Sequence, residues 1–280
     1  LDRSSAASDV YKRQMLAAMP VMAAYTGHVY VDKNKNGVFD QSEKPLAGIK
    51  VSDGLNVVET AADGSFTLPG HERERFIFIT TPSGYKTFNR HYHKIEKKQS
   101  GYDFGLIPYS GRIRKDGSHR YIHITDTEIF NTENHADWVN NVRDYARNEQ
   151  AAFIIHTGDI CYEKGLKAHI KLMNTENMDC PVFYCIGNHD LVKGKYGEEL
   201  FESIYGPVYY SFDAGNVHYV VTPMPGGDHA PGYTSDDVCR WLKNDLAHIR
   251  PGTPVVVFNH DLLTYEDTFI FKSKNAEALI

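Results

Sequence analysis

The sequence predicts a small all-β sandwich followed by an α/β domain with a largely parallel central sheet. Over residues 25–109, short β-type runs alternate with turn signals such as Asp63-Gly64, and no stretch carries a sustained helical period. From residue 110 to residue 280, buried-type strands alternate with amphipathic helical segments, which is the pattern of βαβ units. A chain of 280 residues, of which 41% are hydrophobic, is long enough to build both cores.

Residues 1–24 stand apart from this fold. Residues 1–14 have no hydrophobic periodicity and look like adapter sequence, and residues 15–24 (MLAAMPVMAA) are typical of the end of a secretory signal. We therefore expect an exported protein, periplasmic or at the cell surface, for which association with the cell envelope is one option. The alternative is a disordered apolar leader. No other run approaches the ~18–20 apolar residues of a transmembrane helix. The net charge of −6 argues against a duplex nucleic-acid partner.

In the α/β part, the expected elements follow one another in a regular order. They are a strand at 121–125, a helix at 132–148, a strand at 153–157, a helix at 164–172, a strand at 182–186, a hairpin at 209–221, a capped helix from Ser235 and a strand at 255–258. His218 is expected to be structural within the hairpin. Residues 226–229 are interpreted as a plain flexible loop, with a loop that borders the substrate pocket as the alternative.

Residues 32–43 match the twelve-residue calcium loop at every position. Gly37 stands at the sixth position, where the loop turns sharply. The flanks are predicted strands, so the loop resembles those in the B-type repeats of bacterial surface adhesins, and we expect a structural Ca²⁺ ion. The alternative is a polar hairpin that binds nothing. The six expected ligands are Asp32, Asn34, Asn36, Val38, Asp40 and Glu43.

A polar motif follows each of four strands that are predicted to be parallel. Ligand sites in α/β sheets form at the carboxyl ends of strands, so the four motifs are expected to meet in one crevice. They contribute seven candidate site residues: Asp126, Glu128, Asp159, Asn188, His189, Asp190 and His260.

Residues of these types suit the hydrolysis of phosphate esters. Two divalent cations about 3.5–4 Å apart neutralise the phosphate oxygens and generate a hydroxide for in-line attack. Hard cations prefer carboxylate, amide and imidazole ligands. Asp159, which follows the turn-forming Gly158, suits a carboxylate that bridges both ions. His189 can protonate the leaving alkoxide if Asp190 orients its ring.

The ordered set of motifs resembles the calcineurin-like metallophosphoesterases over residues 110–280. The resemblance implies an α/β sandwich-type metallophosphoesterase domain, a phosphate-ester substrate and two divalent metal ions, Mn, Zn or Fe. It also implies that Asp126 binds the first ion, that Asp159 bridges, and that Asn188 and His260 bind the second ion. In this scheme the acid is His189, with Asp190 as its partner.

The first motif departs from the family pattern at one position. Glu128 stands where the family has the histidine of an Asp-x-His motif. Glu128 either replaces that imidazole as a ligand or points away, in which case the first ion is held differently. Gly158-Asp159-x-x-Tyr162 matches the purple acid phosphatases, whose tyrosine binds ferric iron, so Tyr162 is an alternative ligand. The Asp-x-Gly first motif of that branch is absent.

The family's final Gly-His-x-His motif does not occur in the sequence, and residues 269–280 read as unfinished α/β sequence. We therefore expect a fragment whose complete parent is a metal-dependent phosphoric ester hydrolase. Two alternatives remain: a purple-acid-like phosphomonoesterase with Tyr162-ligated iron, and a calcium-stabilised surface module without catalysis.

Overall fold

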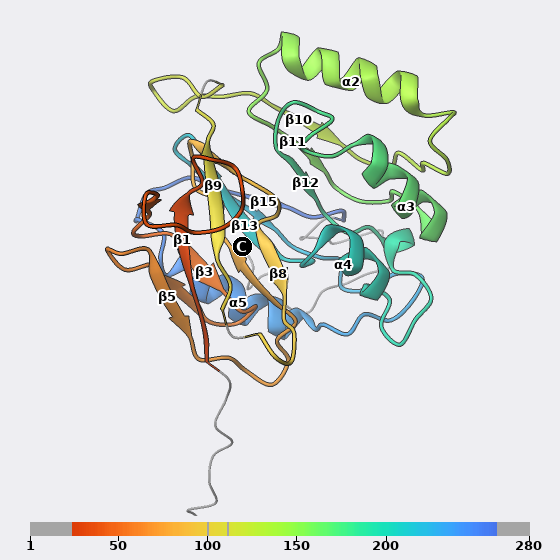
Figure 1. Cartoon of the computed structure of the whole chain (residues 1–280). Helices are drawn as coiled ribbons and strands as arrows, with labels where there is room; N and C mark the ends of the chain where they lie inside the picture. The colour runs from red at the N-terminus through yellow and green to blue at the C-terminus, as the bar shows by residue number, and fades with distance from the viewer. Residues whose placement is uncertain (1–23, 100, 111, 262–280) are drawn as a thin grey trace, which may run out of the picture.

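The computed structural model describes residues 24–99, 101–110 and 112–261 (Figure 1). All the candidate site residues lie within these ranges. The leader-like residues 1–23 and the segment from residue 262 onwards, including the stretch interpreted as unfinished α/β sequence, lie outside the described residues.

Residues 25–109, here called the β-module, fold as two packed β-sheets, which confirms the predicted all-β sandwich. One sheet has the order β2-β1-β9-β7, with β5 also paired to β1, and the other has the order β4-β3-β6-β8. Neighbouring strands are antiparallel except β1 and β9, which run parallel. The strands are β1 (Tyr25–Val31), β2 (Lys44–Pro45), β3 (Lys50–Ser52), β4 (Val57–Glu59), β5 (Ser65–Leu68), β6 (Phe76–Ile79), β7 (Tyr85–Thr87), β8 (Tyr92–Lys94) and β9 (Phe104–Pro108).

The α/β domain contains two further three-stranded sheets. In the first, β10 (Tyr121–Ile124), β11 (Phe153–His156) and β12 (Val182–Tyr184) are all parallel, as predicted. In the second, β13 (Tyr210–Ala214) and β14 (Val217–Val221) form the predicted hairpin. The last strand, β15 (Val255–Phe258), runs parallel to β14.

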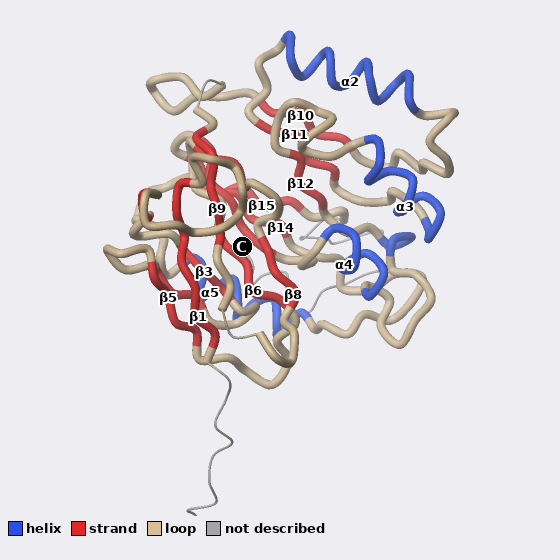
Figure 2. The backbone as a smooth tube through the Cα atoms, in the orientation of Figure 1, coloured by secondary structure: helices blue, strands red, loops and turns tan. Residues whose placement is uncertain are grey.

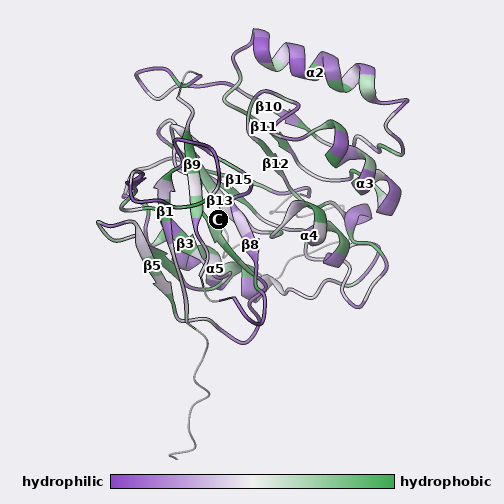
Figure 3. Cartoon of the chain, viewed as in Figure 1, coloured by the Kyte–Doolittle hydropathy of each residue, from purple (hydrophilic) through white to green (hydrophobic). Residues whose placement is uncertain are grey.

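The helices of the α/β domain are α2 (Ala136–Asn148), α3 (Tyr162–Leu172), α4 (Glu199–Tyr205) and α5 (Ser235–Leu246). Helices cover the first of its sheets, and Figure 2 shows α2 and α3 beside the strands β10, β11 and β12. The helix α4 was not expected, because its seven residues are too few to display a helical period. The outer helix α2 is largely hydrophilic, whereas the strands carry most of the hydrophobic colour (Figure 3). No helix in the described ranges is both long and apolar enough to cross a membrane.

One hydrophobic core joins the β-module to the α/β domain. Phe78 of the β-module lies beside Trp241 of α5, with ring centroids 6.2 Å apart, and both side chains are buried. The same cluster contains Phe153 of β11 and Phe212 of β13. Burying aromatic side chains of this size is strongly stabilising. The contact therefore fixes how the β-module sits against the domain that carries the candidate site.

Candidate metal centre

Three of the predicted metal ligands meet at the ends of the strands. Asp126 follows β10, Asp159 follows β11 and His260 follows β15, and ligand atoms of all three lie within 4.8 Å of one another. Asp159 is buried, His260 is partly buried and Asp126 is exposed, so the cluster opens to solvent on one side. An open cluster of two carboxylates and one imidazole offers the donors that Mn, Zn or Fe ions bind, and it leaves room for a substrate.

The backbone at these strand ends is held in an unusual conformation. Asp126 and Asp159 have φ angles of 54° and 53°, in the left-handed region that non-glycine residues rarely occupy. The N–H of Asp126 donates to the carbonyl oxygen of Gly158 at 3.0 Å, so the two tips are tied together. Strained residues of this kind persist where the surroundings over-determine them, and they cluster at functional sites.

His260 presents one ring nitrogen to the cluster. Its Nδ1 lies 2.8 Å from the carbonyl oxygen of Thr157, which can only accept a hydrogen bond. Nδ1 therefore carries a proton, and Nε2, which lies 3.5 Å from Oδ2 of Asp159, faces the cluster. A histidine that binds a metal ion is commonly oriented by such a hydrogen bond from its other nitrogen.

Asp159 is held in its ionised form. Burial alone raises the pKa of this carboxyl group, but the neighbouring His260 ring and a hydrogen bond from the backbone N–H of His189 lower the pKa below its usual value. The N–H of His189 lies 3.1 Å from Oδ1 of Asp159. A ligating carboxyl group has to be deprotonated, so these contacts prepare Asp159 to bind cations.

The ring of His189 has a partner that differs from the expected one. Its Nδ1 lies 2.8 Å from Oδ2 of Asp228, and this hydrogen bond is the main cause that raises the pKa of His189. Asp228 belongs to residues 226–229, which the sequence suggested were a plain flexible loop. The sequence signal for this contact was the Gly226-Gly227 pair. In the structure, a Cβ at Gly227 would come within 2.6 Å of the Asn188 carbonyl oxygen.

Asp190 does not orient His189, which corrects the expectation from the sequence. Its carboxylate is buried and accepts hydrogen bonds from the backbone N–H groups of Cys161 (2.8 Å) and Gly187 (2.9 Å). Burial raises the pKa of Asp190 to about 6, although these hydrogen bonds oppose the rise. Asp190 therefore ties together the loops that follow β11 and β12.

The remaining candidates lie around the cluster. Asn188 is partly buried and opens the 3₁₀ turn Asn188–Asp190 after β12. Glu128 is exposed and is not a member of the three-residue cluster, although its N–H donates to the carbonyl oxygen of Asp159 at 3.3 Å. Tyr162 is 56% exposed, and its ring centroid lies 5.4 Å from that of His189. Ligation by these three residues stays a prediction.

The expected calcium loop is well ordered by its own side chains. The Asp32 carboxylate accepts the backbone N–H groups of Asn36 (3.1 Å) and Gly37 (2.9 Å), and Glu43 accepts that of Lys33 (3.0 Å). Asp32 and Glu43 are both buried. Within the described ranges, neither carboxylate forms an ion pair with Lys, Arg or His. Buried carboxylates are normally paired or bound to a metal ion.

Both parts of the chain match known protein families. Residues 119–278 match the calcineurin-like phosphoesterases, and residues 33–108 match the N-terminal region described for calcineurin-like phosphoesterases. This chain belongs to the calcineurin-like phosphoesterase family. The match confirms the predicted fold class and the predicted enzyme class, a phosphoesterase hydrolase. A comparison of this calcineurin-like phosphoesterase with curated proteins found no match.

Calcineurin-like phosphoesterases typically bind two metal ions. The donor set of Asp126, Asp159 and His260 fits such ions, because it combines carboxylate oxygens with an imidazole nitrogen whose tautomer is already fixed. The match places the chain in a family of phosphoesterase hydrolases. The third interpretation of the sequence, a surface module whose phosphoesterase half has lost function, is decided by the activity assay below.

Proposed function

We propose that this chain hydrolyses phosphate esters with two divalent metal ions held around Asp126, Asp159 and His260. One observation carries the proposal: ligand atoms from three separate strand ends lie within 4.8 Å of one another. Asn188 is the expected additional ligand of the second ion. Bound there, the two ions would neutralise the phosphate oxygens and lower the pKa of a water molecule.

The side chains of this chain provide the remaining functions. Asp159 is ionised, and its position is fixed by the backbone N–H of His189. His189 is the proposed acid, because Asp228 holds its Nδ1 and leaves Nε2 to donate a proton to the leaving alkoxide. The hydrogen bond from Asp228 raises the pKa of His189, so more of the imidazole is in the protonated, donating form near neutral pH.

The first test is the substitution Asp159→Asn. Removing this carboxylate is expected to lower kcat with added Mn²⁺ by at least about a hundredfold, since even changes around metal ligands cost up to about 100-fold. The assay uses a generic phosphomonoester and a generic phosphodiester, and calorimetry of Mn²⁺ binding accompanies it. The matched control is Asp144→Asn, which changes an exposed carboxylate on α2. Hydrolysis that is unchanged in Asp159→Asn would overturn the proposal.

A purple-acid-like phosphomonoesterase is the second candidate function, and the position of Tyr162 beside His189 favours it. A tyrosine bound to ferric iron produces a visible absorption band. In this candidate, iron-loaded protein is coloured and Tyr162→Phe is colourless. A colourless Mn- or Zn-loaded protein with full activity excludes it.

We further propose that residues 32–43 bind a structural Ca²⁺ ion. The two buried carboxylates, Asp32 and Glu43, support this proposal, and an exported protein would meet the calcium concentrations that such loops use. Ca²⁺ at 100 times its Kd stabilises the folded state by about 2.7 kcal/mol and should raise Tm by at least about 5 °C. Asp32→Asn should abolish this shift, whereas Asp63→Asn, in another turn of the β-module, should keep it. A Tm that does not respond to Ca²⁺ would contradict the proposal.

A further inference from the structure

The loop of residues 226–233, here called the Asp228 loop, runs from the candidate centre to the interface with the β-module. At its start, the carboxylate of Asp228 lies 2.8 Å from Nδ1 of His189, and its N–H donates to the carbonyl oxygen of Asn188 at 3.1 Å. In its middle, the carbonyl oxygen of Ala230 accepts the N–H of Gly197 at 2.9 Å. Gly232 lies near its far end. Contacts that fix the backbone of Gly232 therefore also restrict the position of Asp228.

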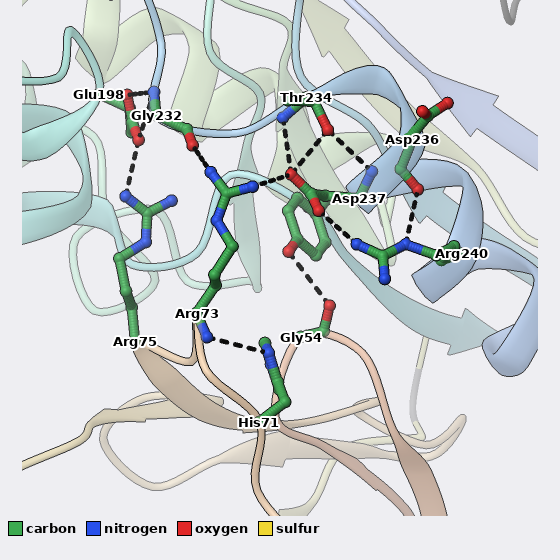
Figure 4. A network of polar contacts seen from close by, with 11 residues as sticks. Gly54, His71, Arg73, Arg75, Glu198, Gly232, Thr234, Asp236, Asp237 and Arg240 are labelled. Carbon is green, nitrogen blue, oxygen red and sulfur yellow. Dashed lines mark hydrogen bonds and ion pairs between the residues drawn. The ribbon is translucent and has the colours of Figure 1, made fainter.

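Two arginines of the β-module hold both polar groups of the Gly232 backbone (Figure 4). Nη2 of Arg73 donates to the Gly232 carbonyl oxygen at 2.5 Å. The Gly232 N–H donates to the carboxylate of Glu198, at 2.9 and 3.1 Å from its two oxygens. Glu198 is completely buried and receives a hydrogen bond from Nη1 of Arg75 at 2.6 Å. One arginine thus acts directly and the other acts through a buried carboxylate.

The anchor also includes the first turn of α5. Nη1 of Arg73 pairs with Oδ2 of Asp237 at 3.0 Å. The same carboxylate accepts hydrogen bonds from the backbone N–H and the hydroxyl of Thr234, the residue that caps α5. Arg73 therefore spans from the Asp228 loop to the helix with one planar guanidinium group, which a single ammonium group cannot reproduce.

The Asp228 loop depends on such anchors because it has no regular structure of its own. It contains Gly226, Gly227 and Gly232 and forms no helix or strand. Glycines give an unanchored backbone many conformations. A catalytic group loses efficiency when its orienting partner moves by as little as about 1 Å.

We propose that the β-module is part of the active-site apparatus, with Arg73 as a positioning residue that holds the Asp228 loop and thereby keeps Asp228 against His189. This inference rests on the proposed function, in which His189 is the acid. Arg75 and the buried Glu198 form the second, indirect part of the same anchor. The β-module accordingly has a role in turnover in addition to its contribution to the shared core.

The first experiment needs no catalytic activity. Hydrogen–deuterium exchange of the full chain is compared for the wild type, Arg73→Ala and Arg240→Ala. Arg240 is the matched control, since it also pairs with Asp237, at 2.6 Å, but belongs to α5 and has no contact with Gly232 among the hydrogen bonds of the described residues. We expect Arg73→Ala to raise exchange at least about tenfold across residues 226–233 and Arg240→Ala to leave it unchanged. Equal exchange in all three proteins would overturn the inference.

The second experiment uses the chemistry of the leaving group. An acid that protonates the leaving oxygen matters for an alkyl phosphate ester and much less for a nitrophenyl ester, whose anion leaves unaided. Arg73→Ala is expected to lower kcat by about tenfold on the alkyl ester and by less than about twofold on the nitrophenyl ester. Arg73→Lys should recover only part of this loss, because lysine can keep one of the two contacts.

A double-substitution cycle separates positioning from general destabilisation. If Arg73 acts through Asp228, adding Arg73→Ala to Asp228→Asn should cause little further loss, so the two effects are not additive. Additive losses, or equal losses on both esters, would overturn the inference while hydrolysis still depends on Asp159. If hydrolysis does not depend on Asp159, the proposed function itself fails, and the catalytic part of the inference fails with it.

Discussion

Gly187 lies where the backbone of one strand end meets Asp159, the proposed metal ligand at the end of another. A Cβ at Gly187 would come within 2.2 Å of both the backbone nitrogen and Oδ1 of Asp159. Gly158 lies against it in turn, since a Cβ there would come within 2.5 Å of the Gly187 nitrogen. The absence of two side chains therefore allows Asp159 to approach its neighbours so closely.

We predict that Gly187→Ala lowers Mn²⁺ affinity and kcat by about 10- to 100-fold, although it changes no ligand. The added methyl group has to displace backbone and the Asp159 carboxylate, neither of which can give way cheaply. Calorimetric Mn²⁺ titration and steady-state kinetics measure the effect. Gly101→Ala is the control, because a Cβ there meets nothing within 4 Å and its φ is not positive. Full metal affinity in Gly187→Ala would contradict this reading of the site.

At the same scale, the sequence predicted the candidate residues that follow strands. It did not predict the contact between His189 and Asp228, which are far apart in the chain. Asp126, Asp159 and His260 each come two or three residues after the end of a strand, so the strand pattern alone placed them at one edge of the sheets. The Asp228–His189 contact joins positions 39 residues apart through a loop without periodicity. Asp190 was assigned to His189 from the family resemblance, whereas its carboxylate accepts hydrogen bonds from the buried backbone N–H groups of Cys161 and Gly187.

At the scale of elements, strong patterns gave the secondary structure of the α/β domain. The strand β15 has the predicted bounds Val255–Phe258, and the helices α2 and α5 lie within the expected segments. Thr234 caps α5 with a reciprocal hydrogen-bond pair to Asp237, a signal that is readable in sequence. In the β-module, short strands such as β7 carry too few residues for alternation to be recognised. The parallel pairing of β1 with β9 depends on chain topology, which residue patterns do not encode.

At the scale of the whole molecule, a buried polar network joins the β-module to the α/β domain beside their shared core. His218 of β14 lies between Asp213 (2.6 Å) and Asp245 of α5 (2.8 Å) and is almost completely buried. Lys50 of β3 reaches Asp213 at 3.3 Å. Burial alone lowers the pKa of His218, but its hydrogen bonds to the two carboxylates raise the pKa to about 9. The protonated imidazole of His218 therefore bridges the carboxylates of Asp213 and Asp245. Asp213 also pairs with Lys50 of the β-module.

This network predicts how the stability of the molecule depends on pH. The pKa of His218 is about 9 in the folded state and 6.5 for the unperturbed group, so the folded state binds the proton more tightly. The stabilisation is complete below pH 6.5 and is lost as the pH rises through 9, with a total loss on the order of 3 kcal/mol. Urea unfolding of the wild type between pH 6 and about 10 measures this loss.

The substitution His218→Gln isolates the contribution of the network from other titrating groups. Burial raises the pKa of Glu202 to about 8, so its carboxyl group also weakens the folded state as the pH rises. The readout is therefore the difference between wild type and His218→Gln, which should shrink by about 3 kcal/mol from pH 6 to pH 10. His248→Gln is the control, because His248 also joins the domain to the β-module, through Glu59 at 3.1 Å, but at a more exposed position. A difference between wild type and His218→Gln that stays constant with pH would show that His218 is not a charged bridge between the two parts.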